Sequence, residues 1–183
     1  MTTSEHDIRR HTEHWVQRVV VALTLCPFAG REVDAGRVRY HVTSSDTELL
    51  LLQALEEEIG YLQAHSDTAT SLLIHPQVLQ DFDDYNQFLD LAEGLLHRRG
   101  AVGELQIASF HPDYRFAGTD YDDAENYSNR SPYPMLHLLR EADVAAAIDH
   151  HPDPDAIPER NIAHLNRLGS QHLVRLLASC RGD

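Results

Sequence analysis

The sequence contains no lysine, since all 15 of its basic residues are arginine. Without a lysine amine, the chain can neither form a Schiff base with a carbonyl substrate nor hold a nucleotide with a P-loop lysine. Cysteine is almost as rare, with Cys26 and Cys180 as its two representatives. Two cysteines make neither a disulfide framework nor a paired zinc motif, so we expect a reducing, cytoplasmic environment.

Long apolar runs and an excess of basic charge are missing too. No segment approaches the roughly 20 apolar residues of a membrane-spanning helix, and residues 1–15 are polar, unlike a signal peptide. Against its 15 basic residues the chain carries 29 acidic ones, for a formal net charge of −14. Such a field repels polyanions, so we expect neither nucleic acid nor a membrane as partner. Oligomeric state is left open.

The length and composition of the sequence are typical of a globular domain. Its 183 residues are 42% hydrophobic and 24% charged, which suits one compact domain with a real core. We expect a single domain over 1–183, with an N-terminal helix in 1–26, a βαβαβ core in 36–110, a site loop in 111–134 and C-terminal helices in 134–179.

Hydrophobic periodicity supports this division. Residues 37–42 alternate in polarity like a strand, and short apolar runs predict further strands at 71–74 and 104–110. Segments with helical spacing separate these strands, a pattern typical of parallel sheets. A helix is also predicted from about residue 134, carrying Met135, Leu138 and Leu139 on one stripe. The fold class is therefore α/β, with a small, mostly parallel, three-stranded sheet, an N-terminal helix and two C-terminal helices.

Two histidines follow predicted strands directly. His75 and His111 each precede a proline, which restricts the backbone of the histidine to extended or turn geometry. If the strands are parallel, their carboxyl ends share one edge, where open α/β sheets bind ligands. We therefore predict catalytic roles for these histidines and for the nearby Tyr114, with Arg115 binding substrate. The alternative is that each imidazole merely ends its strand and hydrogen-bonds to backbone.

A second constellation runs into the helix predicted from residue 134. At a helix N-terminus, free N–H groups and arginine make a cradle for phosphate or carboxylate. Predicted substrate-binding residues here are Asn126, Asn129, Arg130, Ser131, Tyr133 and Arg140, with His137 as a further catalytic residue on the helix face shared with Arg140 and Glu141. The alternative is a capped helix with a solvated polar face.

Thiol and metal chemistry are the remaining alternatives. Cys26 follows a helix end, where negative partial charge disfavours the reactive thiolate, so an inert cysteine is the simpler interpretation. We predict no cofactor. Thirteen histidines nevertheless keep a zinc or iron site as an alternative, built from His75, His111 and His137.

Three stretches carry a family resemblance. They read LCPFAG from residue 25, LLIHPQVLQDFDDYNQFL from residue 72, and QIASFHPDYRFAG followed by NRSPYPMLHLLRE. With these motifs the chain resembles a bacterial family, with plant relatives, that is known only as a domain of unknown function. The resemblance covers nearly the whole chain but implies no activity, cofactor or catalytic residue.

The expected function is therefore inferred from the chemistry of the candidate residues. We expect a small cytoplasmic enzyme that hydrolyses an anionic small molecule or transfers a group, with histidine as acid or base. Arginine would hold the anion, because its planar fork suits phosphate and carboxylate. The alternatives are a non-catalytic domain that binds a metabolite or protein, and a histidine-ligated metalloenzyme.

Overall fold

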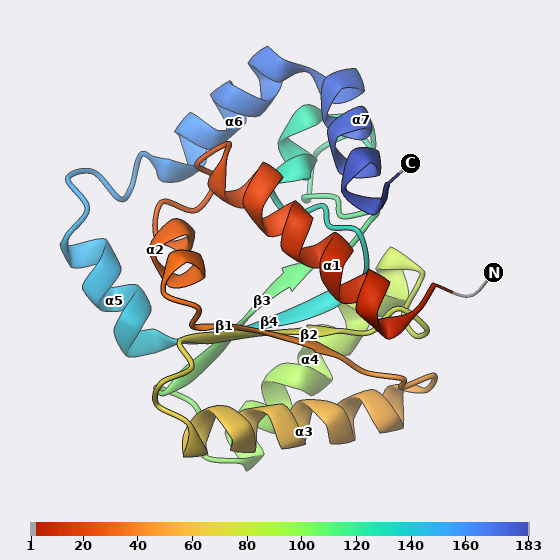
Figure 1. Ribbon diagram of the computed structural model, residues 1–183, viewed down its shortest axis with the longest axis vertical. Helices are drawn as coiled ribbons and strands as arrows, with labels where there is room; N and C mark the ends of the chain where they lie inside the picture. Colours follow the sequence, from red (N-terminus) through yellow and green to blue (C-terminus); the bar gives the residue numbers. More distant parts are fainter. Residues whose placement is uncertain (1–2, 183) are drawn as a thin grey trace.

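The computed structural model describes residues 3–182 and shows an α/β fold with helices on both faces of a four-stranded sheet (Figure 1). The strands are β1 (Val38–Val42), β2 (Thr70–Ile74), β3 (Leu105–Phe110) and β4 (Met135–Arg140), in the order β1-β2-β4-β3. β1 pairs with β2 in parallel, while β4 is antiparallel to both of its neighbours. β3 consequently runs in the same direction as β1 and β2, and the carboxyl ends of all three reach one edge.

Two helices cover the lower face of the sheet and the rest cover its upper face (Figure 1). The lower helices are α3 (Glu48–Ala64) and α4 (Phe82–Arg98). The upper ones are α1 (Glu5–Trp15), which continues as the π-helix η1 (Val16–Val21), then α2 (Ala29–Asp34), α5 (Glu141–Asp149), α6 (Ile157–Leu168) and α7 (Ser170–Arg181). Across residues 3–182, none of these helices combines the length and apolarity needed to span a membrane.

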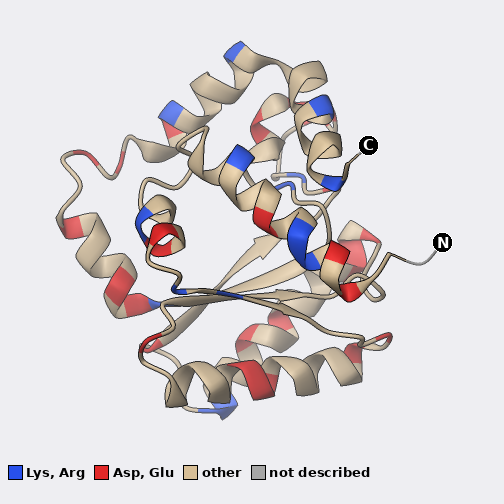
Figure 2. Cartoon of the chain, viewed as in Figure 1, with Lys and Arg blue, Asp and Glu red and all other residues tan. Residues whose placement is uncertain are grey.

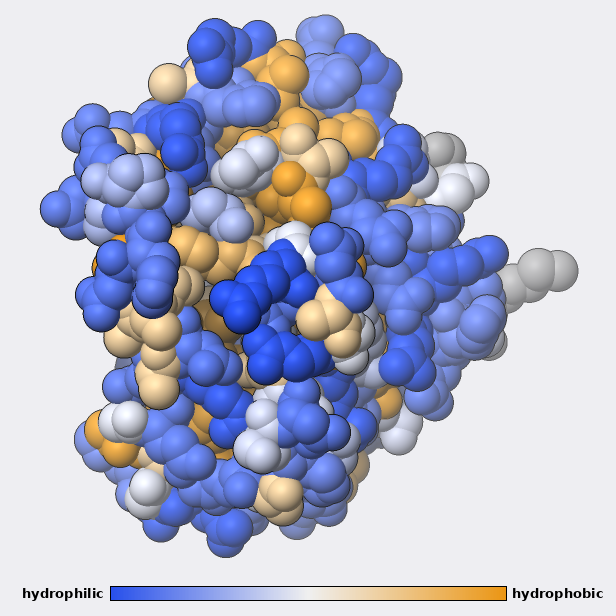
Figure 3. All heavy atoms as spheres, turned by 60° about the vertical axis from the view of Figure 1, so that its left-hand side comes forward, coloured by the Kyte–Doolittle hydropathy of each residue, from blue (hydrophilic) through white to orange (hydrophobic). Residues whose placement is uncertain are grey.

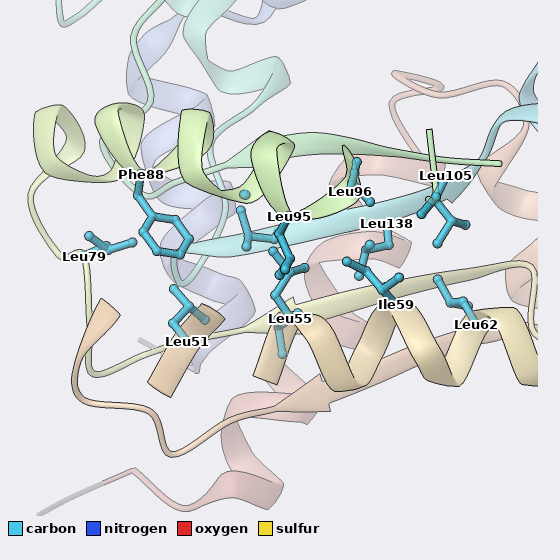
Figure 4. Packing of buried hydrophobic residues seen from close by; sticks show 14 of the residues in the cluster. Leu51, Leu55, Ile59, Leu62, Leu79, Phe88, Leu95, Leu96, Leu105 and Leu138 are labelled. Atoms are coloured by element: carbon cyan, nitrogen blue, oxygen red, sulfur yellow. The ribbon is translucent and has the colours of Figure 1, made fainter. Parts of the chain in front are cut away.

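The lower core forms because α3 and α4 each bury one apolar stripe. Leu51, Leu55, Ile59 and Leu62 of α3 repeat at helical spacing and have no exposed surface. They pack against α4 and the lower side of the sheet, as Figure 4 shows for Phe88, Leu95 and Leu138. Both helices begin at side-chain caps, where Thr47 accepts the N–H of Leu50 and Asp81 accepts those of Asp83 and Asp84.

The three-stranded, mostly parallel sheet predicted from the sequence is wrong, because the helix predicted from residue 134 is the strand β4, followed by α5. β4 lies between two strands and has helices on both of its faces. Such a strand need not alternate strictly in polarity, and MLHLLR is apolar except at His137 and Arg140, whose spacing of three also fits one face of a helix. The helix face shared by His137, Arg140 and Glu141 is therefore wrong too, since side chains at 137 and 140 point to opposite faces of the sheet.

The segment 111–130 is packed against the fold, as its aromatic content indicates. It contains the 3₁₀ helix η2 (Ala124–Ser128), and Asn126, Tyr127 and Arg130 are buried. The two helices expected at the C-terminus are α6 and α7, which break at Gly169 with φ +78°. They follow β4 and α5, so 134–179 is not wholly helical.

A buried carboxylate ties α3 to the first two strands. Glu58 is 1% exposed and accepts hydrogen bonds from Arg39 Nε at 2.6 Å, from His41 Nδ1 at 2.5 Å and from Ser71 Oγ. Burial by itself would raise the pKa of this carboxyl, but the hydrogen bonds outweigh it and hold the pKa at about 2. The Arg39 guanidinium also lies 3.9 Å from the centre of the Tyr61 ring.

Replacing this carboxylate tests its contribution to stability. We expect Glu58→Gln to lower the free energy of unfolding by about 3 to 5 kcal/mol, because it leaves the buried side of Arg39 without its anion. Urea unfolding measures the loss, and the exposed neighbour Glu57→Gln is the matched control. In the parent protein the contribution is full above pH 4.5 and disappears as the pH falls toward 2. Equal stability of the two variants would contradict this role.

Candidate functional site

The structure brings two of the predicted catalytic histidines together at the carboxyl edge of the sheet. The ring of Tyr85 lies between them, with its centre 5.8 Å from that of His75 and 5.1 Å from that of His111. Both histidines are buried, with exposed fractions of 0% and 1%. The shared strand direction thus places this pair as the sequence predicts.

Their hydrogen bonds are mostly structural. His111 Nε2 lies 3.1 Å from the Leu79 carbonyl, so it is the protonated nitrogen, while Nδ1 accepts the backbone N–H of Asp113 at 3.0 Å. His75 Nδ1 likewise donates to the Val78 carbonyl at 3.0 Å, and its buried Nε2 has no hydrogen-bond partner. Burial lowers the pKa of both rings, that of His75 to about 4. To act as a general acid or base, His111 would have to break its hydrogen bonds to Leu79 and Asp113, which stabilise the surrounding loops.

The amide and hydroxyl groups predicted to bind an anion instead form hydrogen bonds within the protein. Asn126 accepts from Phe116 N–H and Thr119 Oγ1 and donates to the Asp120 carbonyl, all within 3.0 Å. Asn129 Nδ2 and Ser131 Oγ also donate to backbone carbonyls, at 3.0 and 2.7 Å. The predicted helix N-terminus behind them does not exist, because β4 begins there. The anion cradle therefore lacks its helix dipole.

Three further predicted ligand residues are occupied by protein contacts. Arg130 is 4% exposed, donates to two backbone carbonyls and lies over the rings of Tyr121 and Tyr127. Arg140 donates to the carbonyls of residues 62, 65 and 68 at 2.6 to 3.0 Å, and so holds the end of α3. The hydroxyl of Tyr133 lies 2.8 Å from His11 Nδ1.

Arg115 differs from the other arginines of the site. It is exposed and makes no ion pair within the described part of the chain. Together with Tyr114, Phe82 and Phe116, it lines an open groove of about 430 Å³ at the carboxyl edge of the sheet. Tyr114, predicted to be catalytic, packs its ring 5.1 Å from that of Phe82 and forms one wall of this groove.

A second cavity, of about 380 Å³, lies on the upper face of the sheet under η1, α2 and α5; we call it the sheet-face pocket. Its walls are mainly apolar and include Trp15, Val20, Leu72, Ala108, Phe110 and Leu139. α2 and α5, which flank it, bury no residue of their own. Figure 3 brings this side forward and shows apolar surface, orange and tan, exposed among hydrophilic side chains.

His137 is one of the polar residues in the wall of this pocket. Its Nε2 lies 2.6 Å from Thr70 Oγ1, and that hydroxyl lies 2.6 Å from the Leu138 carbonyl. The carbonyl can only accept, so Thr70 donates to it and accepts the Nε2 proton of His137. Nδ1 consequently carries a lone pair, and nothing within residues 3–182 donates to it. Burial lowers the pKa of the ring to about 4, which keeps it neutral.

The sequence identifies His137 as a candidate residue, but it does not reveal which residues surround it. Thr70, a hydroxyl in an otherwise apolar strand, is the partner that sequence reasoning missed. Cys26 lines the same pocket as a free thiol. Among the residues that the structure describes, no three histidine, cysteine or carboxylate side chains gather closely enough to hold a metal ion, so His75, His111 and His137 do not form one donor set.

Comparison with known families agrees with the resemblance seen in the motifs. A family model described as "Protein of unknown function (DUF1415)" matches residues 7–175, nearly the whole chain. The chain belongs to this family. No curated protein and no solved structure matches it. For this DUF1415 protein, the chemistry of its pockets is therefore the evidence on function.

Buried neutral histidines make stability depend on pH. With folded pKa values of about 4 against the ordinary 6.5, His75 and His137 bind protons in the unfolded chain first. We therefore expect the free energy of unfolding to fall steadily as the pH is lowered from 6.5 to 4. Urea unfolding across this range measures the slope. His75→Gln should flatten it, whereas His6→Gln, at an exposed position, should leave it unchanged; an unchanged slope in both would refute the assignment.

Proposed function

We propose that this protein binds an apolar small molecule in the sheet-face pocket, with His137 Nδ1 accepting a hydrogen bond from it. The observation that carries this proposal is a neutral imidazole in the wall of a mainly apolar cavity, with Nε2 bound to Thr70 and a lone pair on Nδ1. Sites for small molecules commonly combine apolar walls with a few fixed polar groups. Thr70 supplies the fixation, because its bond to Nε2 sets both the tautomer and the orientation of the ring.

The walls of the pocket give further support. A π-helical turn such as η1 is frequent at functional sites, and Val16 and Val20 of that turn line the cavity. An apolar ligand would gain dispersion contacts and bury apolar surface against these walls.

Binding can be measured with N-phenyl-1-naphthylamine, an uncharged apolar probe that carries one N–H donor. We expect saturable, one-to-one binding, followed by probe fluorescence and by Trp15, the single tryptophan of the chain, which lines the pocket. Ala108→Phe should weaken binding at least about ten-fold, because Ala108 lies beside His137 on β3 and its new ring fills the cavity.

The matched control is Ala145→Phe, which adds the same ring on the exposed side of α5, away from the pocket. This variant should bind as the parent does. Urea unfolding of both variants checks that they fold equally. Equal probe binding by two well-folded variants would show that the probe lies elsewhere and would overturn the proposal.

The acid/base enzyme expected from the sequence is the second candidate, and His137 is the observation in its favour. An imidazole held by a hydroxyl through one nitrogen and free at the other has the arrangement of a general base. The proton would pass from a donor group of the substrate to Nδ1 of His137. The reaction could be a hydrolysis or a group transfer, as the sequence predicts.

This candidate predicts an unusual pH profile for any activity found in a substrate screen. Because burial holds the pKa of His137 at about 4, activity should persist below pH 6.5 and fall only near pH 4. Thr70→Val should lower kcat about 10-fold or more, since it releases the ring. An acid limb at 6.5 in the parent would exclude His137 as the base.

The anionic ligand and the cytoplasmic location remain proposals. An anion would be held by Arg115 in the groove at the sheet edge, since the other two arginines of the predicted site are bound to carbonyls. A reducing compartment is supported by Cys26 and Cys180, which are both free thiols.

A further inference from the structure

The ligand of the sheet-face pocket can be specified further, on the basis that the proposed function is right. The pocket offers an acceptor, the Nδ1 lone pair of His137, in a wall that is mainly apolar. Because no described group donates to Nδ1, a ligand that brings an O–H or N–H gains a hydrogen bond that other ligands lack. This is a preference for a donor group at the inner end of the ligand.

Several aromatic rings contribute to the pocket wall, alongside aliphatic side chains. Trp15 and Phe110 pack edge to face with their centres 5.2 Å apart, and the centre of the His137 ring lies 5.9 Å from that of Phe110. All three residues line the cavity, and Phe28 adds a fourth ring. Aromatic rings prefer offset or edge contacts with other rings, so such a wall favours a planar aromatic body.

The polar side chains of the pocket wall determine which ligand charge is tolerated. Arg140 lines the pocket, and the Nε and Nη2 atoms of its guanidinium donate to three carbonyls at the end of α3. Glu32 is paired with Arg37 at 2.5 Å. Asp143 is exposed and has no ion pair within residues 3–182, so the wall carries a free carboxylate as well as the Arg140 charge.

The charge of the protein around the pocket is also relevant to the ligand. Figure 2 shows acidic residues along α5 and both acidic and basic residues on α2, the two helices that flank the pocket. The chain as a whole carries a formal net charge of −14. A ligand with a negative charge would be repelled by this field as it approached the pocket.

We propose that the sheet-face pocket selects an uncharged aromatic molecule with one hydrogen-bond donor, of the phenol or indole type, and rejects the corresponding carboxylate. The donor bonds to Nδ1 of His137, the ring packs among Trp15 and Phe110, and Asp143 disfavours anions. This differs from the anionic ligand that composition and arginine content suggest.

Three probes of similar size separate these contributions: 4-propylphenol, 4-propylanisole and 4-propylbenzoate. Calorimetry and Trp15 fluorescence report their binding to the full-length protein at neutral pH. We expect the phenol to bind at least about ten-fold more tightly than the anisole, which lacks the donor. The benzoate should bind more weakly than either.

Two variants assign the preferences to residues. His137→Phe keeps a ring of similar size but removes the acceptor, so the phenol should lose its advantage over the anisole. Asp143→Asn should tighten benzoate binding several-fold, and by more than it changes phenol binding. Urea unfolding verifies that both variants fold.

The outcomes separate this inference from the proposed function. If the phenol and anisole bind equally, and Ala108→Phe abolishes both, the pocket binds ligands but the donor preference is wrong. Benzoate binding as tight as that of the phenol would overturn the charge argument. If none of the three probes nor N-phenyl-1-naphthylamine binds, the pocket itself is not a ligand site and both proposals fail.

Discussion

The insertion of β4 between β2 and β3 is the constraint on which the rest of the structure depends. Because β4 is antiparallel to both neighbours, it makes β3 run with β1 and β2 and brings His75 and His111 to one edge. Its alternating side chains serve both layers: Leu136 and Leu138 enter the lower core, whereas His137 faces the upper pocket. One strand therefore sets both the packing and the polar group of the pocket.

Because the chain contains no lysine, arginine makes all of the structural contacts of basic side chains in this fold. A guanidinium carries several N–H donors in a fixed plane, which suits the binding of backbone carbonyls at the ends of elements. Arg140 holds the last turn of α3 in this way, and Arg130 holds two carbonyls of the loop 111–130 between tyrosine rings. Such arginines have few donors left for a ligand. An arginine-rich motif is thus a weaker sign of anion binding than its composition suggests.

Sequence periodicity predicts the β1–α3–β2–α4–β3 part of the fold because each helix there buries one apolar stripe and each strand is bounded by turn residues. It fails at β4, where burial on both faces removes the polar positions that distinguish a strand from a helix. The candidate site was likewise predictable only in part. His137 stands out as a histidine in an apolar run, but its partner Thr70 lies 67 residues away, and only the pairing of β2 with β4 brings the two together.

The depressed pKa of His137 ranks binding ahead of catalysis in this pocket. A general base works best when its pKa is near the working pH, and a ring whose charged form is disfavoured by burial accepts a proton poorly. An anionic substrate would raise that pKa by stabilising the imidazolium, but Asp143 and the acidic helices around the pocket disfavour such a substrate. An uncharged donor meets neither obstacle, since it bonds to the lone pair without transferring its proton. The same burial that weakens His137 as a base therefore preserves it as a hydrogen-bond acceptor across the physiological pH range.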